Sequence, residues 1–309
     1  MTAAIFLRYI DDVMDRSEIL AALAERSRMP WGILSACLEE QNRTQTIFLS
    51  LLTRIGDGPR LSEREEAALY YGIHLLGALK THEALGPLMI LLANHREETD
   101  RILGDPALGE TLPRILMALS QSDADLLWQA ATGGPADWLI RDAYLKAWAY
   151  EVLCGQVERA KARHLLREFP NIVSLQAADP LWVSWLNTAS DVGFAALFQT
   201  VPGLVSSGRI AGGSLGLSDR DLSALANAAA SNTPQKRKTA NWRLTHGYIP
   251  FGASPYTKYD FYSAARLAPG TTEDERRAIV SQAAEEKVAG PVFPDHAENE
   301  NTPPRSGSK

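Results

Sequence analysis

Cations and aromatic side chains alternate along residues 236–266, and this mixture is the strongest chemical signal in the sequence. The stretch holds six lysine or arginine residues and a single acid, Asp260. A guanidinium or ammonium group binds phosphate or carboxylate, and an aromatic face stacks on a nucleotide base or a proline ring. The predicted binding residues are therefore Lys236, Arg237, Lys238, Trp242, Arg243, His246, Tyr248, Tyr256, Lys258 and Tyr259.

Two interpretations of this segment stay open. In the first, it binds a phosphate backbone with a stacked base, or a peptide with acidic and proline groups. In the second, its aromatic rings pack against a helical core while its cations lie in water at the rim. The second is favoured, because aromatic side chains in an irregular segment usually anchor it.

Acids and histidines give weaker signals. Asp105 and Glu110 form a candidate carboxylate pair, but acids near helix starts are explained by the helix dipole. General acid–base chemistry needs a cleft and a shifted pKa, which these residues do not indicate. His74 lies among apolar residues, where a hydrogen-bonded core histidine is expected. The sequence predicts no catalytic residue.

Metal ligands are not indicated either. The two cysteines, Cys37 and Cys154, stand far apart without a paired-cysteine motif, and the six histidines show no zinc-binding spacing. Both cysteines lie in apolar helical contexts, so we expect buried free thiols. We expect no metal and no cofactor.

Four tryptophans occur at helical spacing and raise the question of an aromatic groove. Tryptophan at such spacing more often fills a core than lines a groove. We therefore expect core positions for Trp138, Trp148, Trp182 and Trp185.

Composition bounds the class of protein. The chain has 309 residues, 45% of them hydrophobic and 22% charged, with a formal net charge of −6. This acidic balance argues against a protein whose whole surface binds nucleic acid, although a local basic patch is compatible with it. The longest apolar stretch, near residues 85–93, is too short to cross a bilayer, and the start does not resemble a secretory signal. We expect a cytoplasmic protein with no membrane partner.

The elements that must position these residues are helices. Apolar residues recur three and four apart in successive segments, and no stretch alternates as a strand would. Ser17 and Thr81 are expected helix caps, and Ser62 with Glu65 forms a capping box. Short connections between apolar helices favour antiparallel packing. The predicted fold is all-α, a stack of antiparallel helical hairpins in a HEAT-like α-solenoid with an irregular C-terminal extension.

The sequence divides into three predicted parts. Residues 1–230 form the helical repeat domain, and residues 231–289 form a basic, aromatic extension, in which residues 234–269 show no helical periodicity. That extension ends in one short helix, which a capping box of Thr272 and Glu275 begins. Residues 290–309 are rich in proline, glycine, serine and acids, and are predicted to be disordered.

Several pieces recur in an order that resembles a bacterial family, the domain of unknown function 1186. They are Leu103-Gly104-Asp105, Glu110-Thr111-Leu112, Arg114-Ile115-Leu116, Arg141 to Ala147 with Gly155, and Trp182 to Gly208. The resemblance covers residues 17–230 and implies an all-helical, repeat-like fold without an established activity. Many members carry a C-terminal cysteine-rich zinc motif of the SEC-C type. This chain has no cysteine after Cys154, so that motif is absent.

Three functions follow as hypotheses. The first is a non-catalytic binding or scaffold protein that presents a helical-repeat surface to an unknown protein or peptide. The alternative is a nucleic-acid-associated protein that uses residues 236–266. The second alternative is an enzyme of unrecognised type. It requires a deep pocket containing two or more of Asp105, Glu110, His74 and Arg141.

Overall fold

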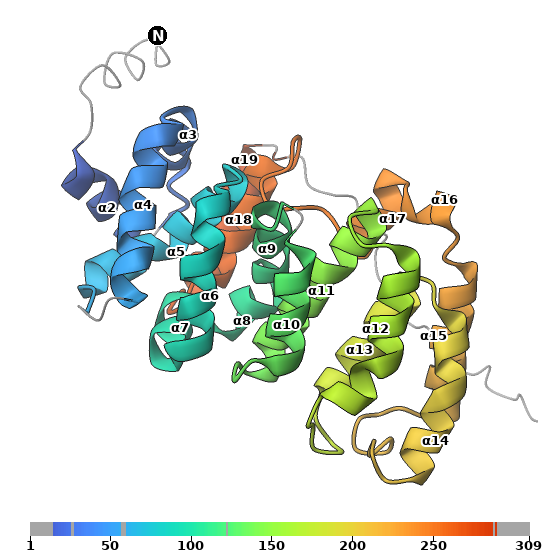
Figure 1. Cartoon of the computed structure of the whole chain (residues 1–309). Coiled ribbons are helices and arrows are strands. Elements are labelled where there is room, and N and C mark those ends of the chain that lie inside the picture. Colours follow the sequence, from blue (N-terminus) through green and yellow to red (C-terminus); the bar gives the residue numbers. More distant parts are fainter. Residues whose placement is uncertain (1–14, 26–27, 57–59, 122, 287, 289–309) are drawn as a thin grey trace, which may run out of the picture.

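The computed structural model describes residues 15–25, 28–56, 60–121, 123–286 and 288. Within these residues every regular element is a helix, which confirms the all-α prediction (Figure 1). The predicted disordered tail, residues 290–309, lies outside the described residues. No described helix combines the length and the apolar content that a membrane span requires.

The first half of the chain forms short and medium helices that follow one another closely. They are α2 (Arg16–Ala24), α3 (Trp31–Glu39), α4 (Gln41–Gly56), α5 (Glu63–Ala78), the 3₁₀ helix η1 (His82–Ala84), α6 (Leu85–Asn94), α7 (Arg96–Ile102), α8 (Gly104–Glu110) and α9 (Leu112–Leu119).

The second half continues the array and then reverses toward its start. Its helices are α10 (Ala124–Gly133), α11 (Trp138–Cys154), α12 (Arg159–Ile172), α13 (Leu181–Asp191), the 3₁₀ helix η2 (Ala195–Thr200), α14 (Val201–Ser206), α15 (Asp219–Ser231), α16 (Pro234–Arg237), α17 (Ala240–Thr245), α18 (Thr257–Leu267) and α19 (Glu273–Glu285). Figure 1 shows α2 to α15 side by side, broadly in chain order.

Local capping explains where several helices begin. At the start of α5, Glu65 N donates to Ser62 Oγ at 3.3 Å and Ser62 N donates to a Glu65 carboxylate oxygen at 2.9 Å, as predicted. The predicted box of Thr272 and Glu275 likewise begins α19.

Two predicted caps are wrong. The carboxylate of Asp15, not Ser17, accepts from Glu18 N at 2.9 Å and caps α2. The hydroxyl of Thr81 caps no helix and instead accepts from Gln45 Nε2 at 3.0 Å. At α2, the Asp15 carboxylate takes the capping position. At Thr81, the hydroxyl is engaged by the Gln45 amide instead.

The middle of the core is aromatic. Helix α11 packs against α9, α10 and α13. Trp148, Trp182 and Trp185 are buried, and Phe169 stacks on Trp185 with ring centroids 5.7 Å apart. These three tryptophans lie in the core as predicted. The prediction is wrong for Trp138, which begins α11 and is 41% exposed.

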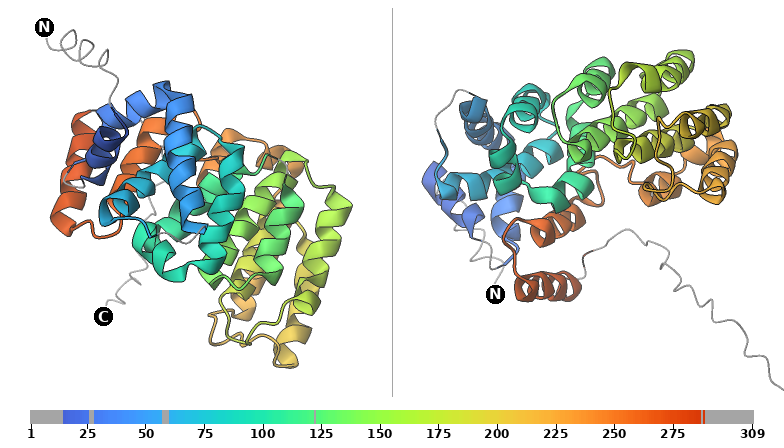
Figure 2. Two further views of the ribbon diagram at one scale, coloured as in Figure 1. Left: turned by 60° about the vertical axis from the view of Figure 1, so that its left-hand side comes forward. Right: turned by 90° about the horizontal axis from the view of Figure 1, so that it is seen from below.

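The C-terminal segment is not irregular, which corrects the prediction for residues 234–269. It contains α16, α17 and α18, and α18 packs against α5 and α8 in the first half of the chain (Figure 2). Two of these helices are too short to show periodicity. The buried residues of α18 itself lie on most sides of the helix, so its sequence shows no single apolar stripe. Its aromatic residues join the core of residues 1–230 and do not form a second core.

A buried ion pair holds the returning segment on α9. Arg114 Nη1 lies 2.8 Å from Asp260 Oδ1, and Arg114 Nε donates to the carbonyl of Ile249 at 2.8 Å. The second carboxylate oxygen of Asp260 accepts from Gly252 N at 2.8 Å. Asp260 is fully buried; this desolvation raises its pKa, and the Arg114 charge opposes the rise.

His74 joins α5 to α9 beneath the same segment. Its Nδ1 lies 2.7 Å from the carbonyl of Tyr70, so Nδ1 carries the proton and donates. Its Nε2 lies 2.9 Å from Thr111 Oγ1 and accepts from that hydroxyl. The ring of Phe251 contacts the imidazole edge-on, with centroids 5.0 Å apart. Complete burial lowers the pKa of His74 to about 4, as suits a neutral core histidine.

Candidate functional site

The aromatic residues of the predicted binding segment pack inward. Trp242 and Tyr248 are buried and stacked, with ring centroids 5.6 Å apart. Trp242 Nε1 donates to Asn232 Oδ1 at 3.1 Å, and Tyr248 Oη donates to Asp191 Oδ2 at 2.8 Å. Because each ring and polar tip already has a protein partner, these faces do not stack on a base.

His246 and two of the predicted cations are also engaged with protein groups. The His246 ring stacks on Trp242 at 4.2 Å. Arg237 is buried and donates to the carbonyl of Asn232. Arg243 donates to the carbonyl of Arg237 at 3.3 Å. By contrast, Lys236 and Lys238 are exposed on the surface.

The remaining three predicted residues lie together at the start of α18. Tyr256 is half-buried at the N-cap of α18. Lys258 pairs with Glu286 at 2.6 Å and lies over the ring of Trp31. Tyr259 lines a hollow between α18 and α19. The ten predicted residues are thus divided between two places and do not form one site.

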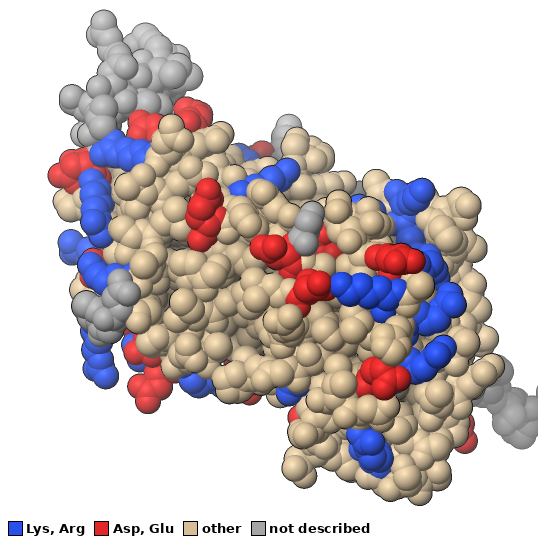
Figure 3. Space-filling view, in the orientation of Figure 1, with Lys and Arg blue, Asp and Glu red and all other residues tan. Residues whose placement is uncertain are grey.

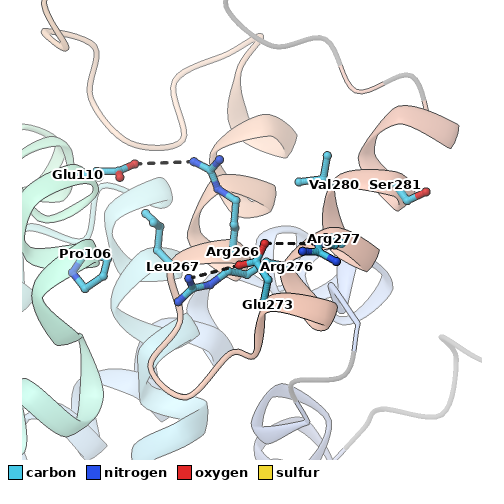
Figure 4. A pocket seen from close by; sticks show the side chains of 9 residues that line it. All are labelled: Pro106, Glu110, Arg266, Leu267, Glu273, Arg276, Arg277, Val280 and Ser281. Atoms are coloured by element: carbon cyan, nitrogen blue, oxygen red, sulfur yellow. Dashed lines mark ion pairs between the residues drawn. The ribbon is translucent and has the colours of Figure 1, made fainter.

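Helices α8, α18 and α19 line a cleft with a volume of about 680 Å³ (Figure 4). Three arginines and two glutamates line it, together with apolar groups and a serine. The lining residues are Pro106, Glu110, Arg266, Leu267, Glu273, Arg276, Arg277, Val280 and Ser281. Arg266 is one of the six cations of the predicted segment, and the other two arginines come from α19.

The arginines of the cleft are only loosely paired. Arg266 reaches toward Glu110 across the cleft, at 4.0 Å (Figure 4). Arg276 lies 4.0 Å from the carboxylate of Glu273, and Arg277 lies 3.4 Å from Glu273 and 3.9 Å from Asp274. The Nε of Arg276 is buried with no hydrogen-bond partner among the described residues. A guanidinium has five N–H donors, so this lining retains donor capacity for an incoming anion.

A second, smaller hollow lies beside the first and shares two of its residues, Arg266 and Val280. Its volume is about 230 Å³. Its other lining residues are mostly apolar or aromatic: Tyr259, Tyr262, Ser263, Ile279, Ala283, Ala284 and Val288. The two hollows are therefore neighbours along α18 and α19, and together they give a groove that is charged at one end and apolar at the other.

The acids, histidine and arginine required by the enzyme hypothesis do not converge. Glu110 lines the cleft, whereas Asp105 is exposed at the start of α8 and His74 is buried under Phe251. Arg141 closes the end of α10 by donating to the carbonyls of Ala131 and Thr132, at 2.7 Å and 3.2 Å. Of the four residues, the cleft contains only Glu110.

Neither cysteine nor metal chemistry emerges from the described part of the chain. Cys37 is buried, and desolvation raises the pKa of its thiol to about 11. Cys154 is exposed at the end of α11, which corrects the prediction that both thiols are buried. Among the described residues, no three His, Cys, Asp or Glu side chains come together as a metal site.

Sequence reasoning missed the α19 side of the cleft. Arg276 and Arg277 follow a capping box and three acids, so they read as ordinary partners on a solvated helix. The available sequence signal was Val280, an apolar residue one turn after the arginines in a polar helix. In the structure its side chain is 54% exposed.

No protein-family model, no curated protein and no solved structure matches this chain. The resemblance to the domain of unknown function 1186 family therefore stays a prediction.

Proposed function

We propose that the chain is a non-catalytic binding protein that holds an acidic, extended segment of a protein partner in the groove along α18 and α19. The observation that carries the proposal is that a charged hollow and an apolar hollow lie side by side and share Arg266 and Val280. A compact small molecule would occupy one hollow, whereas an extended peptide spans both.

The chemistry of the groove defines the segment. Three guanidiniums with distant carboxylate partners favour glutamate or aspartate side chains, which they can bind through two parallel hydrogen bonds. The neighbouring apolar hollow, with Ile279 at its base, favours one aliphatic or aromatic side chain beside the acids. The partner segment is therefore acidic, with an adjacent apolar anchor.

The wider setting belongs to the same proposal. A helical binding protein is consistent with a HEAT-like arrangement of hairpins and with membership of the domain of unknown function 1186 family. It is also consistent with a location in the bacterial cytoplasm. The all-α architecture supports the arrangement.

Fluorescence anisotropy with a panel of labelled peptides tests the proposal. The peptides vary in the number of glutamates and in the position of one leucine, and matched peptides carry lysine for glutamate. We expect the acidic peptides with leucine to bind. Arg276→Glu with Arg277→Glu should weaken binding by about tenfold or more, because each lost charged contact contributes about 1.5–3 kcal/mol.

The control is Lys236→Glu with Lys238→Glu, which makes the same change in net charge on exposed residues of another part of the surface. This variant should bind the peptides as the unmodified chain does. Equal weakening by the two double variants, or no binding by any acidic peptide, would disprove the proposal.

A further inference from the structure

Helix α12 carries a dense row of exposed cations. Arg159, Lys161, Arg163 and Arg167 are all exposed, and the helix contains one acid, Glu168. Its first turn contains no acid. Cations at the N-terminal end of a helix oppose its dipole, so helix stability does not explain this choice of residues.

The basic residues of α16 lie beside those of α12. Arg159 donates to the carbonyls of Val192 and Gly193, at 3.0 Å and 3.1 Å. The Arg237 guanidinium of α16 lies against the same Gly193, so closely that a side chain there would overlap with it. Two segments about seventy residues apart in the sequence thus meet at one turn and combine their charge.

Figure 3 shows several Lys and Arg side chains, with a few acids between them, at the end of the molecule where α12 and α16 lie. The basic face is defined by five exposed residues: Arg159, Arg163 and Arg167, four residues apart on one side of α12, with Lys236 and Lys238. The sequence contains no acid between Asp221 and Asp260, so α16 and α17 bring cations alone.

Few acids neutralise this face. The nearby Asp191 accepts from Tyr248. Two acids, Glu158 at the N-cap and Glu168, belong to α12, and no ion pair joins either to a cation of the face among the described residues. Lys161, on the other side of α12, pairs with Asp125 at 2.7 Å. In the part of the chain that the structure describes, four cations of the face have no carboxylate within ion-pair distance, namely Arg163, Arg167, Lys236 and Lys238. A concentrated, unpaired positive field therefore persists on a protein whose net charge is −6.

The face also lacks the apolar centre of a protein interface. Phe194 is buried beneath Arg159 and Arg163, which lie 4.5 Å and 5.4 Å from its ring centroid. Ile172, at the last position of α12, is the one large exposed hydrophobic residue among the described residues of α12, α16 and α17. Protein interfaces and membrane-surface helices both need buried apolar contacts, whereas a phosphate backbone needs only cations.

We propose that the basic face binds the sugar–phosphate backbone of nucleic acid without reading its bases. The phosphates lie against the four unpaired cations, and the rings of Trp242 and Tyr248 position α16 and α17 from beneath. Among the described residues of α12, α16 and α17 no Phe, Tyr or Trp ring is exposed for stacking, so affinity is set by charge and not by sequence. This proposal does not depend on the peptide groove, which other helices form.

The test measures binding of the full chain to a short fluorescein-labelled duplex DNA between about 50 and 200 mM salt. Contacts to four phosphates give a slope of log affinity against log salt of about −4, and affinity falls by about a hundredfold over this range. Arg163→Gln with Arg167→Gln, and separately Lys236→Gln with Lys238→Gln, should each reduce the slope to about −2. Duplexes of different sequence should bind equally.

The matched control is Arg276→Gln with Arg277→Gln, which removes the same charge from the α19 cleft and should leave the slope unchanged. An equal loss in this control would mean that net charge, not the basic face, governs binding. Binding to phosphatidylserine vesicles without binding to the duplex would assign the face to a membrane surface and overturn the proposal. Failure of this test leaves the peptide result unaffected, because the probes differ and the positions tested in one experiment serve as the control in the other.

Discussion

At the scale of single residues, His74 links stability to pH. Its pKa is about 4 in the folded chain and about 6.5 in the unfolded chain, so the unfolded state binds the proton first as pH falls. The contribution of neutral His74 is fully present above pH 6.5 and is lost as pH falls toward 4. The full shift corresponds to about 3 kcal/mol of unfolding free energy.

Urea denaturation at a series of pH values from 7 to 4 measures this contribution. We expect the unmodified chain to lose more stability over this range than His74→Gln, which does not titrate. Parallel curves for the two proteins would show that His74 is not the responsible group. The other acids and histidines titrate in both proteins and cancel in the difference.

The pair of Arg114 and Asp260 makes a second residue-scale prediction. Asp260→Ala leaves the partly buried guanidinium of Arg114 without its counter-charge, at a cost of about 3–5 kcal/mol. Lys161→Ala, which breaks an exposed pair with Asp125, should cost less than about 1 kcal/mol. Urea midpoints compare the two variants, and a similar shift in both would contradict the anchoring role of Asp260.

At the scale of elements, Gly252 determines how closely the returning segment approaches α5. Its φ is +75°, and a Cβ at this position would lie 2.5 Å from the Cα of Ala78. Gly252→Ala should therefore destabilise the chain by several kcal/mol, through both overlap and backbone strain. Gly213→Ala, in open space, is the control and should change the thermal midpoint little.

The elements that sequence could predict are those determined locally. A capping box is complete within four residues, so it predicts a helix start from the sequence alone. This holds for Ser62 with Glu65 and for Thr272 with Glu275. Helix α18 was missed because tertiary contacts, such as the hydrogen bond from Tyr70 Oη to the carbonyl of Ala264, stabilise it. Sequence periodicity does not report a helix whose neighbours come from distant segments.

The same limit applied to the sites. Adjacent cations and rings along residues 236–248 suggested one binding surface, but packing turned Trp242 and Tyr248 inward and left the lysines outside. The α12 cations seemed an ordinary solvated helix face until the fold placed them beside α16. Likewise, Arg266 and Arg277 are far enough apart in sequence that only the hairpin of α18 and α19 brings them together.

At the scale of the whole molecule, the core depends on the C-terminal segment. A chain that ends at Ala230 loses Phe251, which contacts His74 of α5, and the carbonyl of Ala264, which accepts from Tyr70. It also loses Asp260, the partner of Arg114. We expect this truncation to melt at a lower temperature and with less cooperativity, because large buried apolar surface becomes exposed. A chain ending at Val288 is the control, and circular dichroism melting curves compare the two.

A stable, cooperative Ala230 truncation would instead show that residues 1–230 fold alone. In that case the buried contacts of the returning segment would be an addition to a complete domain.

The return of α18 to α5 and α8 also restricts how such a chain can evolve. An open row of repeats can gain or lose a hairpin at little cost, since each unit touches only its neighbours. Here an added hairpin between α9 and α13 would separate Tyr248 from Asp191 or Phe251 from His74, because one connector must reach both. Homologues that keep this return should therefore share a fixed helix number and vary instead in loop length and surface charge.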